Sequence, residues 1–581
     1  MTDEAQAVDE KTLWREHCLN AVRKFVMHAV VIDNQPVLDQ AEIIDHKIAK
    51  TATLADKGMG DVPPEEDEKI EKEGKEAEDI RDHNLNVREI SDAFAEQEIA
   101  CAFVLPYDED KDEAKIFNRI MAASKPADIV VIDWYLRDNN AELTKRILAA
   151  IAENDAAEKG RLRLICVYTG QTDTEMVIKD SVAALLAGGL ESSKIDEEAG
   201  CAYGNHHCLL VLNKQGVHGA ALPVKILEAL TVLSDGILPT FALAAVAAIR
   251  RNVHHIITRF SSDLDAAFVG NRLITDPPGD VAELLRELFV SECDTALGLE
   301  KVVDNYLEAS SITHWLKSKK QPVLQGEYSY KSNNADKIKV KIDANFIDSL
   351  LSNGIVGDCV NVKGDNKREF REDKRQKVSH ALHGGKSDAK TGESNFARFV
   401  SLKREAFGNL KRSSAEKWLP SLTLGTLLRQ QVDTAGEKFF KYYYCLTPAC
   451  DTIRLNGKQR TFQMLEIEQA KGMTNLLVTE EGETCKKLFI DAHPKYVRTF
   501  NFKGDDITGR VQASQCEDAE SRLTTFLFNT ADDTPIELFW LGEVRRNRAN
   551  RDMADLNRQW LRFGIHDSEY LRLAAKGKAD T

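Results

Sequence analysis

Short apolar runs alternate with longer helical patterns from residue 25 to about residue 235. Runs rich in β-branched residues predict buried strands at 25–33, 99–105, 127–133, 162–169 and 208–214. Between and after them, apolar residues recur three and four positions apart, which predicts helices at 87–98, 113–123, 141–154, 174–188 and 224–233. Strands that alternate with helices are typical of a parallel sheet. We therefore expect an α/β domain over residues 1–235, with a doubly wound, five-stranded parallel sheet.

The alternation is interrupted once and then stops. Residues 45–86 form a charged insertion that is too acidic to be buried in a core. Long helical patterns over 236–320 predict a helical domain. Beyond it, residues 321–581 combine helical and strand patterns, so we expect a mixed α+β C-terminal domain, with strands at 337–343, 438–447 and 485–491.

Composition narrows the class of protein. The chain has 581 residues and a formal net charge of −16, which disfavours nonspecific attraction to nucleic acid. The apolar segment 238–249 is too short to cross a bilayer, and the acidic N-terminus does not resemble a secretory signal. The 11 cysteines have no small-scaffold spacing and indicate reduced thiols. We expect a cytoplasmic protein that binds neither membranes nor nucleic acid.

Polar residues stand at the ends of several predicted strands. They are Asp33 and Asn34, Asp133, Thr169 and Lys214. In a parallel sheet the carboxyl ends of the strands share one crevice, so these groups should lie close together. An aspartate can accept a phosphoryl group when Mg²⁺ and a fixed cation neutralise the charge, and a hydroxyl can then turn toward the new group.

The segments VVIDN, VVIDWYL, CVYTG and VLNKQG resemble the receiver domain of bacterial response regulators over about residues 20–235. The resemblance implies a flavodoxin-like strand order. It also implies that Asp133 is the phosphoacceptor, that Asp33, Asn34 and Asp133 hold Mg²⁺, and that Thr169 and Lys214 are the hydroxyl switch and the lysine of the family.

This chain departs from the family pattern in two ways. Asn34 stands where the family has a second carboxylate, and an amide oxygen carries no full charge toward a metal ion. The stretches from Asp33 to Asp133 and from Thr169 to Lys214 are also long. The Asp133 crevice is therefore interpreted either as a phosphorylation site or as a site that only binds a partner.

Two hypotheses remain for the output. The segment 442–455 and the arginine-rich tail resemble, more loosely, large receiver-like proteins found beside histidine-kinase-like (GHKL-type) ATPases in bacterial defence islands. This resemblance implies a signalling protein that works through protein contacts with such an ATPase, in an antiviral context. The alternative is an effector enzyme with its site in 321–581, for which the candidates are His383, Lys386, Asp451 and Arg454.

Several further motifs have two readings. CAYGNHHC at 201–208 could hold zinc, although its spacing favours a loop with a buried Cys208. Cys445 and Cys450 are interpreted as packed thiols rather than nucleophiles. HGGKSDAKTGE at 383–393 lacks the order of a phosphate-binding loop and predicts a polar loop. On the tail helix, Met553, Leu556, Trp560 and Phe563 share one face, whereas Arg551, Arg558 and Arg562 form a solvated face or a docking site for acidic partners.

Overall fold

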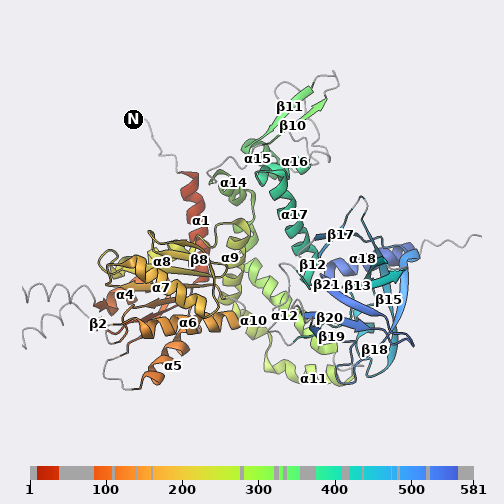
Figure 1. The fold of residues 1–581 in the computed structure, drawn as a ribbon, viewed down its shortest axis with the longest axis horizontal. Coiled ribbons are helices and arrows are strands. Elements are labelled where there is room, and N and C mark those ends of the chain that lie inside the picture. Colours follow the sequence, from red (N-terminus) through yellow and green to blue (C-terminus); the bar gives the residue numbers. More distant parts are fainter. Residues whose placement is uncertain are drawn as a thin grey trace, which may run out of the picture. The chain divides into compact units, whose positions relative to one another are not determined.

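The structure is a computed structural model that describes two compact units (Figure 1). One unit comprises Met1–Pro322 and Ala344–Glu369, and the other comprises Val323–Asp343 and Phe370–Thr581. The described residues are 9–37, 84–106, 112–137, 140–158, 161–274, 280–318, 326–331, 337–353, 375–407, 418–434, 437–470, 472, 474–480, 485–517 and 524–560. Most of the predicted charged insertion 45–86 lies outside these residues, as do Arg562 and Phe563.

The first unit contains a sheet whose five parallel strands have a flavodoxin-like order, as predicted. The order is β4-β1-β5-β6-β9, and every neighbouring pair is parallel. The strands are β1 (His28–Ile32), β4 (Ala100–Val104), β5 (Ile129–Ile132), β6 (Arg163–Thr169) and β9 (His207–Asn213). Each predicted strand is therefore present, although the first is shorter than 25–33 because Phe25 ends a helix.

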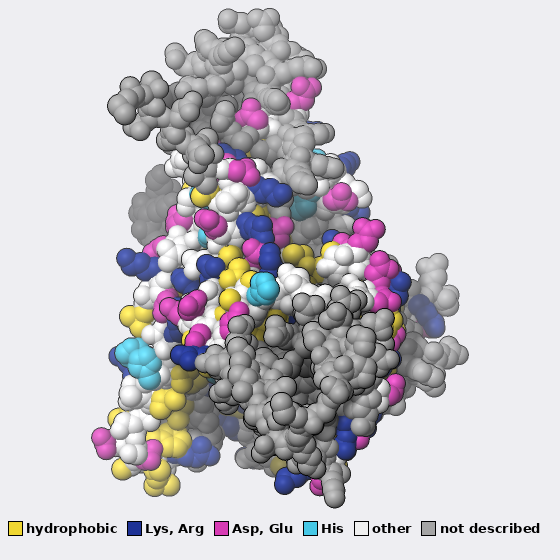
Figure 2. Space-filling model, turned by 90° about the vertical axis from the view of Figure 1, so that its left-hand side faces the viewer, with side chains coloured by type: hydrophobic (Ala, Val, Ile, Leu, Met, Phe, Trp, Pro, Cys, Tyr) yellow, Lys and Arg dark blue, Asp and Glu magenta, His cyan; other side chains and the backbone are white. Residues whose placement is uncertain are grey.

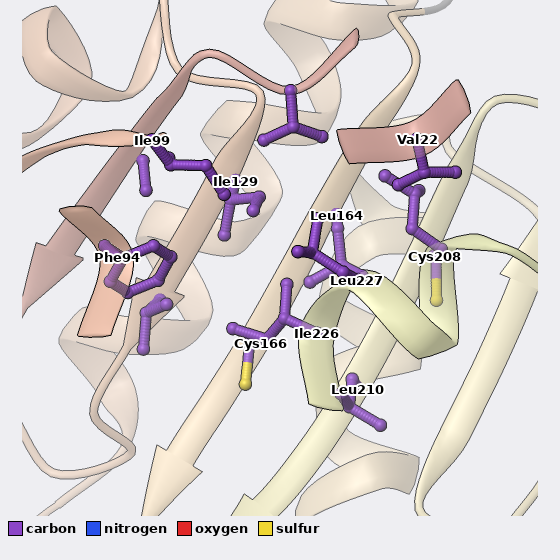
Figure 3. Close-up of a cluster of buried hydrophobic side chains, with 14 of the residues drawn as sticks. Val22, Phe94, Ile99, Ile129, Leu164, Cys166, Cys208, Leu210, Ile226 and Leu227 are labelled. Carbon is purple, nitrogen blue, oxygen red and sulfur yellow. The ribbon is translucent and has the colours of Figure 1, made fainter. Parts of the chain in front are cut away.

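Strands β1, β5, β6 and β9 are covered by helices on both faces, which explains why they are apolar without alternation, whereas the edge strand β4 is partly exposed. Alternate residues such as Val31, Ile129, Cys166 and Leu210 pack on one face with α1 (Glu10–Phe25), α4 (Val87–Glu96), α8 (Leu222–Leu230) and α9 (Ile237–Arg251). Figure 3 shows Ile226 and Leu227 of α8 over the strands on this face. The intervening residues pack with α5 (Glu113–Ser124), α6 (Glu142–Ala157) and α7 (Thr174–Ala187).

The prediction of five strands was too low, because the sheet has seven. The strands β7 (Ser192–Asp196) and β8 (Cys201–Gly204) form an antiparallel hairpin that pairs with β9. Four of the five residues of β7 are exposed, so this edge strand has no apolar run that a sequence pattern could reveal. CAYGNHHC at 201–208 is consequently β8, a turn and the start of β9, and not a loop. The strands β2 (Pro36–Val37) and β3 (Leu85–Asn86) form a separate two-stranded parallel sheet that is not hydrogen-bonded to the seven-stranded sheet.

The region predicted as a helical domain, residues 236–320, is helical and belongs to the same compact unit as the α/β sheet. Helix α9 packs against α1, and its Arg250 binds Asp128 at the start of β5 with an Nη2 to Oδ2 distance of 3.1 Å. Residues 238–249 form most of α9, which buries one face, as expected of a buried helix. The remaining helices are α10 (Val253–Arg259), α11 (Asp265–Ile274), α12 (Asp280–Leu299), α13 (Val302–Tyr306), α14 (Ala309–Ser318) and α15 (Ala344–Asn353). Among the described helices, none is both long and apolar enough to cross a membrane.

The second unit is built on a ten-stranded sheet whose neighbouring strands are antiparallel. Its strands are β12 (Leu402–Glu405), β13 (Thr426–Thr434), β14 (Glu437–Cys445), β15 (Gln459–Gln469), β16 (Leu476–Thr479), β17 (Cys485–Phe489), β18 (Val497–Lys503), β19 (Ser514–Glu517), β20 (Thr524–Asn529) and β21 (Glu537–Val544). The unit also contains the hairpin of β10 (Gly326–Lys331) and β11 (Lys337–Ile342), and the helices α16 (Arg375–Leu382), α17 (Lys386–Ser401) and α18 (Arg546–Trp560). The predicted strands 337–343, 438–447 and 485–491 correspond to β11, β14 and β17.

The tyrosine-rich segment at 442–445 is a core strand of this sheet. Tyr442 and Tyr444 face one buried cluster and Tyr443 faces the other, as the two-residue period of a strand requires. Their hydroxyls have partners, since Tyr442 donates to Glu480 at 2.5 Å and Tyr444 donates to Asp552 at 3.2 Å. The tyrosines therefore stabilise the core of the second unit through both apolar area and hydrogen bonds.

Candidate functional site

Asp33 and Asp133 lie side by side because their strands are in register. Ile32 of β1 is paired with Ile132 of β5, so each aspartate follows the last residue of its strand on adjacent strands. The amide of Asp133 donates to the carbonyl of Ile32 at 2.9 Å. Both carboxylates are buried, with 1% and 8% of the residue exposed. Two acidic groups are thus held close together with little access to water, which is unfavourable unless a cation is present.

Lys214 supplies that cation. It follows β9, and its Nζ lies 2.8 Å from Oδ2 of Asp33 and 2.9 Å from Oδ1 of Asp133. The backbone amide of Lys214 donates to the carbonyl of Thr169 at 2.8 Å, which fixes the start of its side chain beside β6. The Nζ also lies 5.8 Å from the centre of the Tyr168 ring. One buried ammonium therefore bridges two carboxylates that come from different strands.

The remaining carboxylate oxygens accept backbone hydrogen bonds. Gln35 N donates to Oδ1 of Asp33 at 2.7 Å, and Tyr135 N donates to Oδ2 of Asp133 at 2.9 Å. In addition, Thr144 Oγ1 donates to the backbone carbonyl of Asp133 at 3.0 Å. The sequence analysis did not identify these donors, since a backbone amide has no signature in the sequence. They hold both side chains in fixed orientations.

The electrostatics of the crevice favour a further cation. Burial raises the pKa of Asp33 to about 6, and the charge of Asp133 acts in the same direction, although Lys214 opposes it. Burial would lower the pKa of Lys214, but the charges of Asp33 and Asp133 raise it overall. Lys214 therefore stays protonated, and two ionised carboxylates with one ammonium leave one uncompensated negative charge.

Thr169 and Asn34 are near this cluster in the chain but make different contacts. Thr169 ends β6, the strand between β5 and β9, and only 2% of it is exposed. Its hydroxyl oxygen accepts a hydrogen bond from Gln171 N at 3.2 Å. Asn34 directly follows Asp33 and is half-buried. The structure thus joins Asp33, Asp133 and Lys214 by direct contacts and places Thr169 at the same edge of the sheet.

The two carboxylates of the crevice fit the Mg²⁺ that the resemblance implies. A carboxylate oxygen has two lone pairs, and the described contacts occupy one on each oxygen of Asp33 and Asp133. Within the described ranges, no group of three or more His, Cys, Asp or Glu residues is placed to hold a metal ion. A cation here would therefore have two carboxylates as charged ligands, which suits Mg²⁺ because Mg²⁺ keeps several waters.

The competing motifs are not assembled into sites. Cys201 and Cys208 are buried in the β8–β9 hairpin, where His207 Nε2 lies 3.1 Å from the hydroxyl oxygen of Ser192. Cys445 is buried in β14, and burial raises the pKa of its thiol to about 12, whereas Cys450 is exposed. The interpretation as a packed thiol is therefore confirmed for Cys445 but was wrong for Cys450, which lies in an exposed turn after β14. The prediction of a polar loop at 383–393 was wrong, because residues 386–393 begin helix α17.

The four residues of the enzyme hypothesis lie in two separate segments of the second unit. His383 follows α16 and is exposed, with its Nδ1 2.9 Å from the carbonyl oxygen of Ser379. Lys386 is an exposed residue at the start of α17. Asp451 forms an ion pair with Arg460 at 3.1 Å, and Arg454 has a left-handed backbone with φ of 74°. These observations do not add support to the enzyme hypothesis, which stays a prediction.

The fold and the site together define a doubly wound α/β domain in which a lysine bridges two buried aspartates at the carboxyl edge of the sheet. Residues 25–219 match the family model of the response receiver domain. This segment is therefore a receiver domain, and it supports a role in signal transduction. Comparison with curated proteins gave no significant match, and comparison with solved structures gave none either.

Proposed function

We propose that the chain is a signalling protein whose state is set at Asp133 and read by other proteins. The observation that carries the proposal is the bridge from Lys214 to both Asp33 and Asp133, made from residues far apart in the sequence. A structural ion pair would need one carboxylate for one lysine. A second buried carboxylate adds an unfavourable charge, and such arrangements are concentrated at functional sites.

The proposed chemistry is transfer of a phosphoryl group to Asp133. An oxygen of the Asp133 carboxylate forms a bond to phosphorus, while the bond from phosphorus to the donor's leaving group breaks and the leaving group keeps the electron pair. Lys214 stabilises the added negative charge, and Asp33 together with Asp133 would hold Mg²⁺, which supplies further charge neutralisation. The hydroxyl of Thr169 would turn from Gln171 toward the new group and so change the surface of the domain.

Asn34 is expected to make this reaction slow. An amide at this position gives the cation one charged ligand fewer than a carboxylate would. Receiver domains can act by binding alone, and this second possibility uses the same crevice without covalent chemistry. The two versions differ in whether Asp133 gains mass.

Intact mass of the full-length protein tests the reaction after incubation with acetyl phosphate and Mg²⁺. We expect a slow gain of one phosphoryl group, faster in Asn34→Asp and absent in Asp133→Asn. The variant Asp173→Asn, which changes an exposed helix-capping aspartate, serves as the control and should behave as the parent. A gain that persists in Asp133→Asn would refute the assignment, and no gain in either the parent or Asn34→Asp would favour the binding-only version.

The proposed partner is a histidine-kinase-like (GHKL-type) ATPase, because the large receiver-like proteins that the tail resembles are found beside such ATPases. The proposed context is antiviral defence in the cytoplasm. The net charge of −16 supports protein partners over nucleic acid. Co-purification with the tagged full-length chain should recover an ATPase of this kind, and recovery should change in Asp133→Asn. Tight binding to duplex DNA at physiological salt, with a steep dependence on salt, would contradict the proposal.

A further inference from the structure

Helices α11 and α12 carry many more apolar side chains than they bury. No residue of α11 is buried, and among the described side chains of α12 only Ala296 is buried. The exposed large apolar residues are Val269, Leu273 and Ile274 on α11, and Leu284, Leu288, Phe289, Val290 and Leu299 on α12. A ten-residue helix is marginal in water without tertiary packing. Helix α12 packs against α9 and α13 of the same unit, but α11 buries no residue, so α11 in particular needs a covering surface in order to be stable.

Some of the exposed apolar residues lie on one face of each helix, whereas Ile274 of α11 and Phe289 and Val290 of α12 lie outside that face. On α11, the side chains of Ala266, Val269 and Leu273 lie on one face at helical spacing, whereas the half-buried Phe268 points away from it. On α12, Leu284, Leu288 and Leu299 lie along one line that continues through Ser291 and Thr295. Figure 2 shows hydrophobic side chains gathered in a strip at the lower left of the face that it presents. Apolar faces of this kind, unlike scattered single residues, mark interaction surfaces.

We propose that a second copy of this chain covers this face, with the two α11 helices crossing antiparallel about a two-fold axis near Val269. Asp265 and Arg272 stand seven residues apart, on either side of Val269, and both are exposed. Antiparallel pairing about Val269 places Asp265 of each copy beside Arg272 of the other. The face is therefore complementary in charge to itself, as a two-fold interface must be.

Small residues at the centre permit this crossing. A Cβ added at Gly270 would have no heavy atom within 4 Å, and Ala266 lies one turn before it. Two helices can approach closely where such residues meet, and Val269 and Leu273 then pack against the partner helix. Two helix pairs brought together in this way form a four-helix arrangement with a shared apolar core.

The size of the face fits a dimer of modest affinity. The 20 residues of α12 span about 30 Å, the ten residues of α11 span about 15 Å, and each helix is about 10 Å across. The two helices together offer a footprint of about 450 Å², roughly half of the 800 Å² per partner that a standard interface buries.

Sedimentation equilibrium of the full-length protein, with paired charge reversals, tests the proposal. The parent should be dimeric at micromolar concentration. Asp265→Arg alone and Arg272→Asp alone should each raise the dissociation constant at least about tenfold, because each puts like charges opposite each other. The double variant should recover the parental dissociation constant. An equimolar mixture of the two single variants should form heterodimers, since the mixture restores both opposite-charge pairs.

A second variant tests the apolar contact. Val269→Glu should abolish the dimer while the circular dichroism spectrum stays unchanged, and Leu186→Glu, at an exposed leucine of α7, should leave the dimer intact. Three results would overturn the proposal: a monomeric parent at 50 µM or about that concentration, a dimer that tolerates Val269→Glu, or single charge reversals that the double variant does not rescue. A monomeric parent that loses thermal stability in Val269→Glu would instead show that another part of the same chain covers the face.

Discussion

Lys214 is the residue on which the charge balance of the crevice depends. It is 9% exposed and contacts two carboxylates that are also buried. Removing one member of a buried charged network leaves the others desolvated and without compensation, which costs more than the network contributes when intact. The cost should therefore appear as a change in stability that depends on the ionisation of Asp33.

Lys214→Met should destabilise the first unit by about 3 kcal/mol at pH 7.5. The loss should be smaller at pH 5, because Asp33 is then largely protonated and one of the two unpaired charges is removed. Urea unfolding followed by circular dichroism at the two pH values measures this difference. Lys225→Met, at an exposed lysine of α8, is the matched control and should change stability little. An equal loss at both pH values would contradict the coupling to Asp33.

The raised pKa of Asp33 predicts a stability that falls as pH rises. The folded pKa of about 6 exceeds the ordinary aspartate pKa of 3.8, so the contribution of Asp33 is fully present below about pH 4 and is lost as pH rises through 6. The quantity to follow is the unfolding free energy of the parent minus that of Asp33→Asn, measured with a chelator present. This difference should fall by up to about 3 kcal/mol between pH 4 and pH 7.

Added Mg²⁺ should reduce that fall if Asp33 binds the ion, because the metal binds the deprotonated carboxylate. Parallel denaturation series in EDTA and in Mg²⁺, for the parent and for Asp33→Asn, measure the effect. No difference between the two series above pH 6 would mean that Asp33 does not hold the ion.

At the scale of elements, the β7–β8 hairpin is the main addition to the expected five-stranded sheet. Gly200 is the last residue of the turn between β7 and β8, and its φ is 62°. Its carbonyl oxygen accepts a hydrogen bond from Val211 N at 2.7 Å. A Cβ at Gly200 would lie 2.9 Å from the carbonyl oxygen of Val211. Both the backbone conformation and the space therefore favour glycine.

Gly200→Ala should destabilise the first unit by about 1 to 3 kcal/mol, through the left-handed backbone and the close contact. Gly216→Ala is the control, because its added Cβ would meet only the Asn213 carbonyl oxygen, at 3.8 Å. Chemical denaturation of both variants checks the prediction. If the two substitutions cost the same, the hairpin does not depend on this turn.

At the scale of the whole molecule, the two compact units have separate cores. Residues such as Ile132 belong to a cluster of the first unit, and Phe462 belongs to a cluster of the second, where its ring packs against Phe502 with centroids 5.3 Å apart. Units with separate cores unfold as separate cooperative blocks.

Calorimetry of the full-length protein should therefore show two transitions. Ile132→Ala and Phe462→Ala each remove a fully buried side chain and should each cost about 2 to 5 kcal/mol. Ile132→Ala should lower only one transition temperature, and Phe462→Ala should lower only the other. A single transition that both variants shift equally would show that the units fold together.

The sequence by itself determined the class of the first unit and which polar residues stand at the carboxyl ends of its strands. Buried parallel strands must be apolar along their whole length, so the runs that end at Asp33, Asp133 and Thr169 are visible as strands without any structure. The carboxyl ends of such strands share one edge, and this rule places Lys214 with them. The resemblance to receiver domains then depended on the same segments, and the family match over 25–219 confirmed it.

Only the tertiary structure decided how these groups interact. The bridge from Lys214 to both carboxylates, the amides of Gln35 and Tyr135, and the raised pKa of Asp33 all depend on register and burial, which no local pattern encodes. The same reason explains the missed hairpin, because an exposed edge strand such as β7 is held by backbone hydrogen bonds to its neighbour and needs no apolar run of its own. The local apolar pattern shows which side chains of a segment will be buried. It does not show which other segment they will pack or pair with, because that partner is fixed only when the chain folds.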